Sequence, residues 1–123
     1  MESKNNTSWT GTWKNQYGSV LTIEAEEAGR IKGTFQSAVD PGVKEGIVTG
    51  ICSNDLIAFA AMGEGGRKVA SWTGILRNGR IETLWHVAVN EKLVAGAEGV
   101  PATKKTAGIW EAFVTGADTF ERV

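Results

Sequence analysis

The sequence contains a single cysteine, Cys52, and only 2 prolines among 123 residues. One cysteine cannot form a disulfide within the chain, so folding needs no oxidising compartment, and we interpret Cys52 as a small buried apolar residue. Residues 1–6 are polar and lack the apolar core of a secretory signal, and no apolar run is long enough to span a bilayer as a helix. We therefore expect a soluble chain, which would be secreted if a signal peptide precedes this sequence.

The sequence also lacks an excess of either charge. It has 13 Lys and Arg residues and 14 Asp and Glu residues, for a formal net charge of -1. This balance offers no basic stripe for nucleic acid and no polybasic segment for a membrane surface. His86 is the only histidine, and the sequence contains no metal-ligand cluster, nucleophile elbow or phosphate-binding glycine motif. These absences argue against an enzyme and favour a small molecule or a second copy of the chain as the partner.

Glycine, in contrast, is abundant, with 16 residues that separate short runs rich in Val, Ile, Thr, Phe and Trp. No long apolar stripe of helical period is present, and turn signals such as Asn78-Gly79 are short enough to join antiparallel neighbours. We predict one all-β domain over residues 1–123, with a polar tail over 1–8, folded as an eight-stranded antiparallel up-and-down β-barrel. Such a barrel has room inside for side chains or for one small ligand. The strands are expected over Trp9–Asn15, Ser19–Glu26, Ile31–Val39, Gly46–Cys52, Leu56–Met62, Lys68–Leu76, Arg80–Asn90 and Ile109–Thr115.

The segment 91–108 is longer than a hairpin requires and mixes Gly and Ala with a few larger apolar residues. Long loops in compact domains often carry function. Two interpretations are open for this segment: a lid over the mouth of the barrel, or a mobile or short helical excursion.

Alternation of side chains across a strand predicts which residues share the interior. Four of the 5 tryptophans can face one interior, and Val87 shares a face with Trp85. An apolar box with a few convergent polar groups is the usual form of a small-molecule site. The pattern alone, however, favours tryptophans that simply fill the core. The residues that can meet there are Trp13, Trp72, Trp85 and Trp110, together with Asn15, Ser19, Ser37 and Asp118.

Five motifs add specificity because they occur in a fixed order along nearly the whole chain, from about Thr10 to Val123. They are Gly11–Ser19 (GTWKNQYGS), Gly33–Val39 (GTFQSAV), Ser71–Gly74 (SWTG), Thr83–Trp85 (TLW) and Gly116–Phe120 (GADTF). In order and spacing this set resembles the avidin and streptavidin family.

The resemblance implies noncovalent binding of biotin or a biotin-like molecule in the open end of the barrel, with no turnover, cofactor or metal. Asn15, Ser19 and Ser37 would bind the ureido end with Asp118, and Trp72 and Trp85 would form walls around the thiophane ring. Trp110 would cap the site of a neighbouring subunit, which implies a homo-oligomer, a tetramer or a dimer. The ligand-binding residues expected on this basis are Asn15, Ser19, Phe35, Ser37, Val39, Lys68, Ala70, Trp72, Trp85, Val87, Trp110 and Asp118.

Four positions depart from the family pattern. Phe35 replaces a tyrosine whose hydroxyl donates to the ureido oxygen, a loss of ~1–3 kcal/mol, and Gly63 replaces a wall tryptophan, a loss of ~3–5 kcal/mol. Ala70 and Lys68 replace hydroxyls that touch the ligand's sulfur and carboxylate, and Lys68 would either reach solvent or pair with that carboxylate. We therefore expect weaker binding than the family norm. The alternatives are an avidin-fold or lipocalin-like carrier retuned to another apolar ligand, and a barrel with a decayed site that acts as an interaction module.

Overall fold

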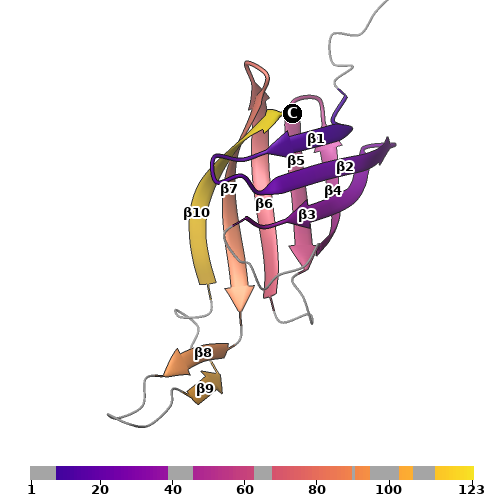
Figure 1. Ribbon diagram of the computed structural model, residues 1–123. Helices are drawn as coiled ribbons and strands as arrows, with labels where there is room; N and C mark the ends of the chain where they lie inside the picture. The colour runs from indigo at the N-terminus through magenta and orange to yellow at the C-terminus, as the bar shows by residue number, and fades with distance from the viewer. Residues whose placement is uncertain (1–7, 39–45, 63–67, 90, 95–102, 107–112) are drawn as a thin grey trace, which may run out of the picture.

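The computed structural model describes residues 8–38, 46–62, 68–89, 91–94, 103–106 and 113–123. Eight of the strands in these ranges close into an antiparallel barrel in the order β1-β10-β7-β6-β5-β4-β3-β2 (Figure 1), which confirms the predicted architecture. Within the described ranges there is no helix long and apolar enough to cross a membrane. The strands are β1 (Gly11–Lys14), β2 (Val20–Glu27), β3 (Arg30–Gln36), β4 (Gly46–Ser53), β5 (Leu56–Met62), β6 (Lys68–Arg77), β7 (Arg80–Val89), β8 (Glu91–Val94), β9 (Thr103–Thr106) and β10 (Phe113–Arg122).

Two tight hairpins show how local sequence sets the strand order. Asn78 and Gly79, between β6 and β7, have φ values of 51° and 76°, and Ala28 and Gly29, between β2 and β3, have φ values of 53° and 77°. Positive φ at both central residues defines the turn whose twist matches that of the flanking strands. The connections therefore hold consecutive strands side by side, and the barrel follows the chain as a meander.

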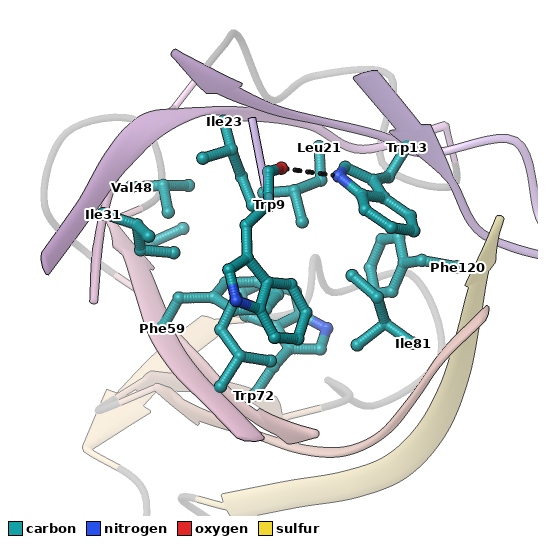
Figure 2. Close-up of a cluster of buried hydrophobic side chains, with 12 residues drawn as sticks. Trp9, Trp13, Leu21, Ile23, Ile31, Val48, Phe59, Trp72, Ile81 and Phe120 are labelled. Carbon is teal, nitrogen blue, oxygen red and sulfur yellow. Dashed lines mark hydrogen bonds between the residues drawn. The ribbon is translucent and has the colours of Figure 1, made fainter. Parts of the chain in front are cut away.

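The core fills one end of the barrel, the end at which the chain enters β1. Trp9 precedes β1, is 1% exposed, and lies in the middle of the cluster of buried side chains in Figure 2. Its carbonyl accepts a hydrogen bond of 3.0 Å from Nε1 of Trp13, and its backbone N–H donates to Oε1 of Glu26 at 2.8 Å. Trp9 was expected as a strand residue, and the structure instead places it as a plug in the barrel interior.

Arg122, near the end of the chain, fixes this plug. Its guanidinium carbon lies 4.1 Å from the ring centroid of Trp13, and its two terminal nitrogens donate to the carbonyls of Thr10 and Ser8, each at 2.7 Å. A guanidinium over an indole face adds a cation–π attraction to these two bonds. Residues 8–13 and the end of β10 are therefore held together at the closed end of the barrel.

The last barrel strand was predicted wrongly. The structure places β10 at Phe113–Arg122 rather than at Ile109–Thr115, and residues 109–112 lie outside the described residues. Gly116 and Asp118 disfavour strands by propensity, which hides this part of the strand from sequence reasoning. Pairing with β7 on one side and with β1 on the other overrides that propensity.

The segment 91–108 contains the two short strands β8 and β9, which pair with each other in antiparallel register. Figure 1 shows this small sheet beyond the barrel, past the ends of β7 and β10. The expectation of a helical excursion is wrong for these described residues, because Glu91 pairs with Thr106 as a strand does. The lid interpretation stays a prediction.

Cys52, expected as a small buried apolar residue, is half-buried and packs against the core near the end of β4. Its Sγ lies 3.7 Å from Oε2 of Glu26. Partial burial and the nearby Glu26 carboxylate raise the pKa of the Cys52 thiol.

Candidate ligand-binding site

A cavity of about 420 Å³ occupies the end of the barrel opposite Trp9, which is not among its lining residues. Every predicted ligand-binding residue that the structure describes lines this cavity, whereas Val39 and Trp110 lie outside the described residues. Sequence reasoning missed four further lining residues. The full lining is Asn15, Tyr17, Ser19, Phe35, Ser37, Gly46, Ala61, Met62, Lys68, Ala70, Trp72, Trp85, Val87 and Asp118.

Small side chains at matching positions on adjacent strands leave this space open. Ala61 on β5 stands opposite Ala70 on β6, and Ala70 stands opposite Val87 on β7. Paired residues of an antiparallel ladder point to the same face, so these three side chains share one stretch of the interior wall. A run of small residues at one level of a barrel produces a hollow where larger residues would fill the core.

An aromatic stack forms the floor of the cavity. The ring of Trp72 is stacked on that of Phe59 at a centroid distance of 4.9 Å and 15° between planes. The ring of Phe35 lies against Trp72 from another side, at 4.8 Å and 47°. Such pairs fix each other's orientation, and Trp72 is only 5% exposed. The floor is therefore a rigid apolar surface.

Asp118 places a carboxylate beside this floor although it is 6% exposed. Its Oδ2 accepts a hydrogen bond of 3.1 Å from Nε1 of Trp72, and its Oδ1 accepts one of 3.4 Å from Nε2 of Gln16. Gln16 is itself anchored, because its Oε1 accepts from the backbone N–H of Thr119 at 2.9 Å. Buried charges need such partners, and Gln16 is a supporting residue that the sequence motifs did not reveal.

Asn15 and Ser19 present donors from the turn between β1 and β2. Oδ1 of Asn15 accepts from the backbone N–H groups of Tyr17 at 3.0 Å and Ser19 at 2.9 Å, so its amide nitrogen keeps both N–H donors for the cavity. Oγ of Ser19 accepts from the backbone N–H of Ala38 at 2.8 Å and can donate its own proton elsewhere. Donors on this turn thus converge on a cavity that also holds the Asp118 carboxylate.

Comparison with known proteins identifies the barrel. A sequence model of the avidin family matches residues 3–123. The chain belongs to the avidin family.

Solved structures of avidin-like proteins share its fold. Core-bradavidin is 31% identical with a TM-score of 0.67, and the match covers 91% of this chain and 97% of that chain. A bradavidin2–biotin complex is 21% identical with a TM-score of 0.66, covering 95% of this chain and 99% of that chain. A biotin complex of a shwanavidin variant is 22% identical with a TM-score of 0.71, with the same two coverages of 95% and 99%.

Trp85 forms one wall of this avidin-family cavity and packs against β10 at Gly116. Gly116 is its Cα partner, and a Cβ built on Gly116 would come within 2.3 Å of Cζ2 of the indole. Nε1 of Trp85 is buried and has no hydrogen-bond partner within the described part of the chain. The position of the Trp85 ring therefore requires a residue without a Cβ at position 116.

Lys68 is the first residue of β6 and lines the cavity at its mouth. Among the described lining residues it supplies the one cation, and Asp118 supplies the one carboxylate. Phe35, which departs from the family pattern at the cavity floor, packs its phenyl ring against Trp72 and has no hydroxyl. Gly63, the fourth departure, lies outside the described residues.

Proposed function

We propose that this avidin-family barrel binds biotin, or a molecule with the same ureido head, noncovalently and without turnover. The observation that carries this proposal is the convergence of Asn15, Ser19 and Asp118 on one cavity above the Trp72 floor. A cyclic urea carries one carbonyl acceptor and two N–H donors. The amide of Asn15 and the hydroxyl of Ser19 would donate to that carbonyl, and the carboxylate of Asp118 would accept from an N–H.

The remaining walls complete the proposed site. Ser37 would accept from the second ureido N–H, and Trp72 and Trp85 would enclose the fused ring, with Ala70 and Val87 above them. Val39 would lie beside the ligand. Burial of the ring against two indoles would contribute to the binding free energy, and the few polar groups would set its orientation.

The absence of a hydroxyl on Phe35 should weaken this site relative to a barrel with tyrosine there. One missing hydrogen bond to a buried acceptor costs ~1–3 kcal/mol, which corresponds to roughly a five- to 150-fold increase in Kd. We therefore propose biotin affinity below the family norm.

Isothermal titration with biotin tests the proposal, and the variant Asp118→Asn sharpens it. The amide retains an oxygen for Nε1 of Trp72 but loses the charge, so we expect biotin Kd to rise about 10- to 150-fold. Asp55→Asn, in the exposed turn before β5, is the matched control and should leave Kd unchanged. Absence of saturable biotin binding by the unaltered protein would refute the proposed function.

A carrier for a bulkier apolar ligand is the second candidate, because Ala61, Met62, Ala70 and Val87 give the upper cavity an apolar lining. Iminobiotin and a free fatty acid in the same titration separate the two candidates. Fatty-acid binding that biotin does not displace would favour the carrier. Binding of neither class would favour a barrel whose ligand site has decayed.

We further propose that the protein is a homo-oligomer, a dimer or a tetramer, in which Trp110 caps a neighbour's site. Support comes from the uncharged part of the outer surface of β4, β5, β6, β7 and β10, here called the neutral face. Large apolar residues on it are exposed, including Ile47 at 78%, Leu84 at 64% and Ile51 at 63%. Two consecutive rows across these strands contain no Lys, Arg, Asp or Glu. They are Ile51, Ala58, Thr73, Leu84 and Ala117, and Thr49, Ala60, Ser71, His86 and Thr115.

Light scattering on the purified protein measures this assembly. Leu84→Asp places a charge in the neutral face, and we expect it to produce monomers with an intact barrel by circular dichroism. Thr22→Asp, on the outer surface of β2, is the control and should keep the native mass. A monomeric native protein would refute the oligomer.

A further inference from the structure

Among the described lining residues, one carboxylate and one ammonium group lie at opposite ends of the cavity. Asp118 is buried at the floor, where Oδ2 accepts from the indole of Trp72. Lys68 begins β6 at the mouth and is exposed to solvent. Within the described lining, the floor thus carries a carboxylate and the rim carries an ammonium group.

Strand geometry gives the separation of these two levels. Lys68, Ala70 and Trp72 alternate with outward residues on β6 and so share the interior face. Four residues of an antiparallel strand span about 13–14 Å, and the lysine side chain can lean along part of that length. A ligand that reaches from the floor to the ammonium group must be elongated, with its two functional groups at opposite ends.

The charge of each end selects the ligand group that fits there. An anionic group at the floor would face the carboxylate of Asp118 in a site with little water, where repulsion between like charges is strong. A neutral head that donates hydrogen bonds avoids that repulsion. At the rim, a carboxylate gains a charge-assisted partner in Lys68.

We infer that Lys68 makes this site selective for the free acid of its ligand over amides of the same acid. The inference rests on the proposed function and adds a specificity to it: free biotin is preferred to biotin whose carboxyl group is joined to an amine. The apolar rim residues Val87 and Met62 cannot make this distinction, because neither carries a charge or a hydrogen-bonding group strong enough to separate the two forms.

The size of the preference follows from the exposure of Lys68. An exposed ion pair contributes less than a buried one, and a charge-assisted hydrogen bond contributes more than a neutral one. We expect the Kd for biotin amide to be about three to ten times the Kd for biotin. Because the pair is near solvent, raising the salt concentration should shrink this ratio.

Titration of biotin and biotin amide against four proteins tests the inference. Lys68→Met removes the charge and keeps the length of the apolar stem, so the ratio should fall to about one through weaker biotin binding alone. Lys68→Arg keeps the charge and should retain the ratio. Lys32→Met removes a cation from the outer surface of β3 and is the control for net charge, with no change expected.

Charge reversal gives a second readout that a purely structural role of Lys68 would not produce. Lys68→Glu should bind a biotin derivative that ends in an amine more tightly than it binds biotin. Equal weakening of biotin and biotin amide by Lys68→Met would overturn the inference while leaving the proposed function intact. If the unaltered protein binds neither compound, the proposed function is wrong and the inference falls with it.

Discussion

Gly116→Ala tests the packing of the Trp85 wall. The added Cβ would lie 2.3 Å from Cζ2 and 2.7 Å from Cε2 of the indole, far inside van der Waals contact, so the ring must move. The backbone of β10 cannot retreat easily because it is paired with β7 along Phe113–Glu121. The open side of the ring is the cavity. We therefore expect the indole to swing into the ligand site.

Overpacking of this kind costs about 1–3 kcal/mol in unfolding free energy. Biotin affinity should fall by at least about tenfold, which corresponds to ~1.4 kcal/mol. Urea unfolding measures the first quantity and isothermal titration the second. Thr119→Ser, on the outward side of the same strand and outside the neutral face, is the control and should change each by less than about 0.5 kcal/mol.

The reasoning would be refuted if Gly116→Ala matched the control in both measurements. That result would mean that Trp85 does not rest on Gly116 in solution. A loss of stability without any loss of biotin affinity would show that the ring yields away from the cavity, and would remove Trp85 from the proposed site.

Three further predictions concern other parts of the barrel. Phe35→Tyr should lower biotin Kd by roughly five- to 150-fold in the same titration, and an unchanged Kd would place the ureido oxygen elsewhere. Arg122→Ala should lower the unfolding free energy by about 1–3 kcal/mol in urea, because one cation–π contact and two hydrogen bonds to Ser8 and Thr10 are lost; a change below about 0.5 kcal/mol would contradict the clamp. Because its raised pKa keeps the Cys52 thiol protonated, alkylation by iodoacetamide should stay slow near neutral pH and accelerate only in more alkaline buffer. Glu26→Gln should shift that rate profile to lower pH, and an identical profile would exclude the carboxylate as a cause.

The strands that the sequence specified best are those bounded by strong turn signals. β5 was predicted at its observed bounds, and β6 and β7 differ from prediction by one residue at an end, because Asn78-Gly79 marks their hairpin. β10 could not be placed in the same way, since its Gly116 and Asp118 suit a turn locally and become strand residues only when β7 and β1 flank them. Trp9 was missed for a similar reason: its burial depends on Arg122, which is more than a hundred residues away.

The cavity was predictable mainly through the motifs and only partly through alternation. Alternation correctly grouped Trp72 with Ala70 and Lys68. It could not include Met62, whose position on β5 is outward by parity but which lines the rim where the strand ends. Gln16 was equally invisible, because its contact with Asp118 joins residues that are 102 positions apart.

The clamp of Arg122 on the amino-terminal segment also has a kinetic consequence. β1 pairs with β2 and β10, so closure of the barrel requires the first and last strands of the meander to meet. Contacts of such long sequence separation form slowly, because a large loop must close before they yield any stabilisation. During synthesis Trp9 and Trp13 leave the ribosome well before the arginine that holds them in place, which lies more than a hundred residues later in the chain. These two indoles therefore lack their final environment until β10 has been made, and over that interval they are exposed apolar surface that a chaperone can protect.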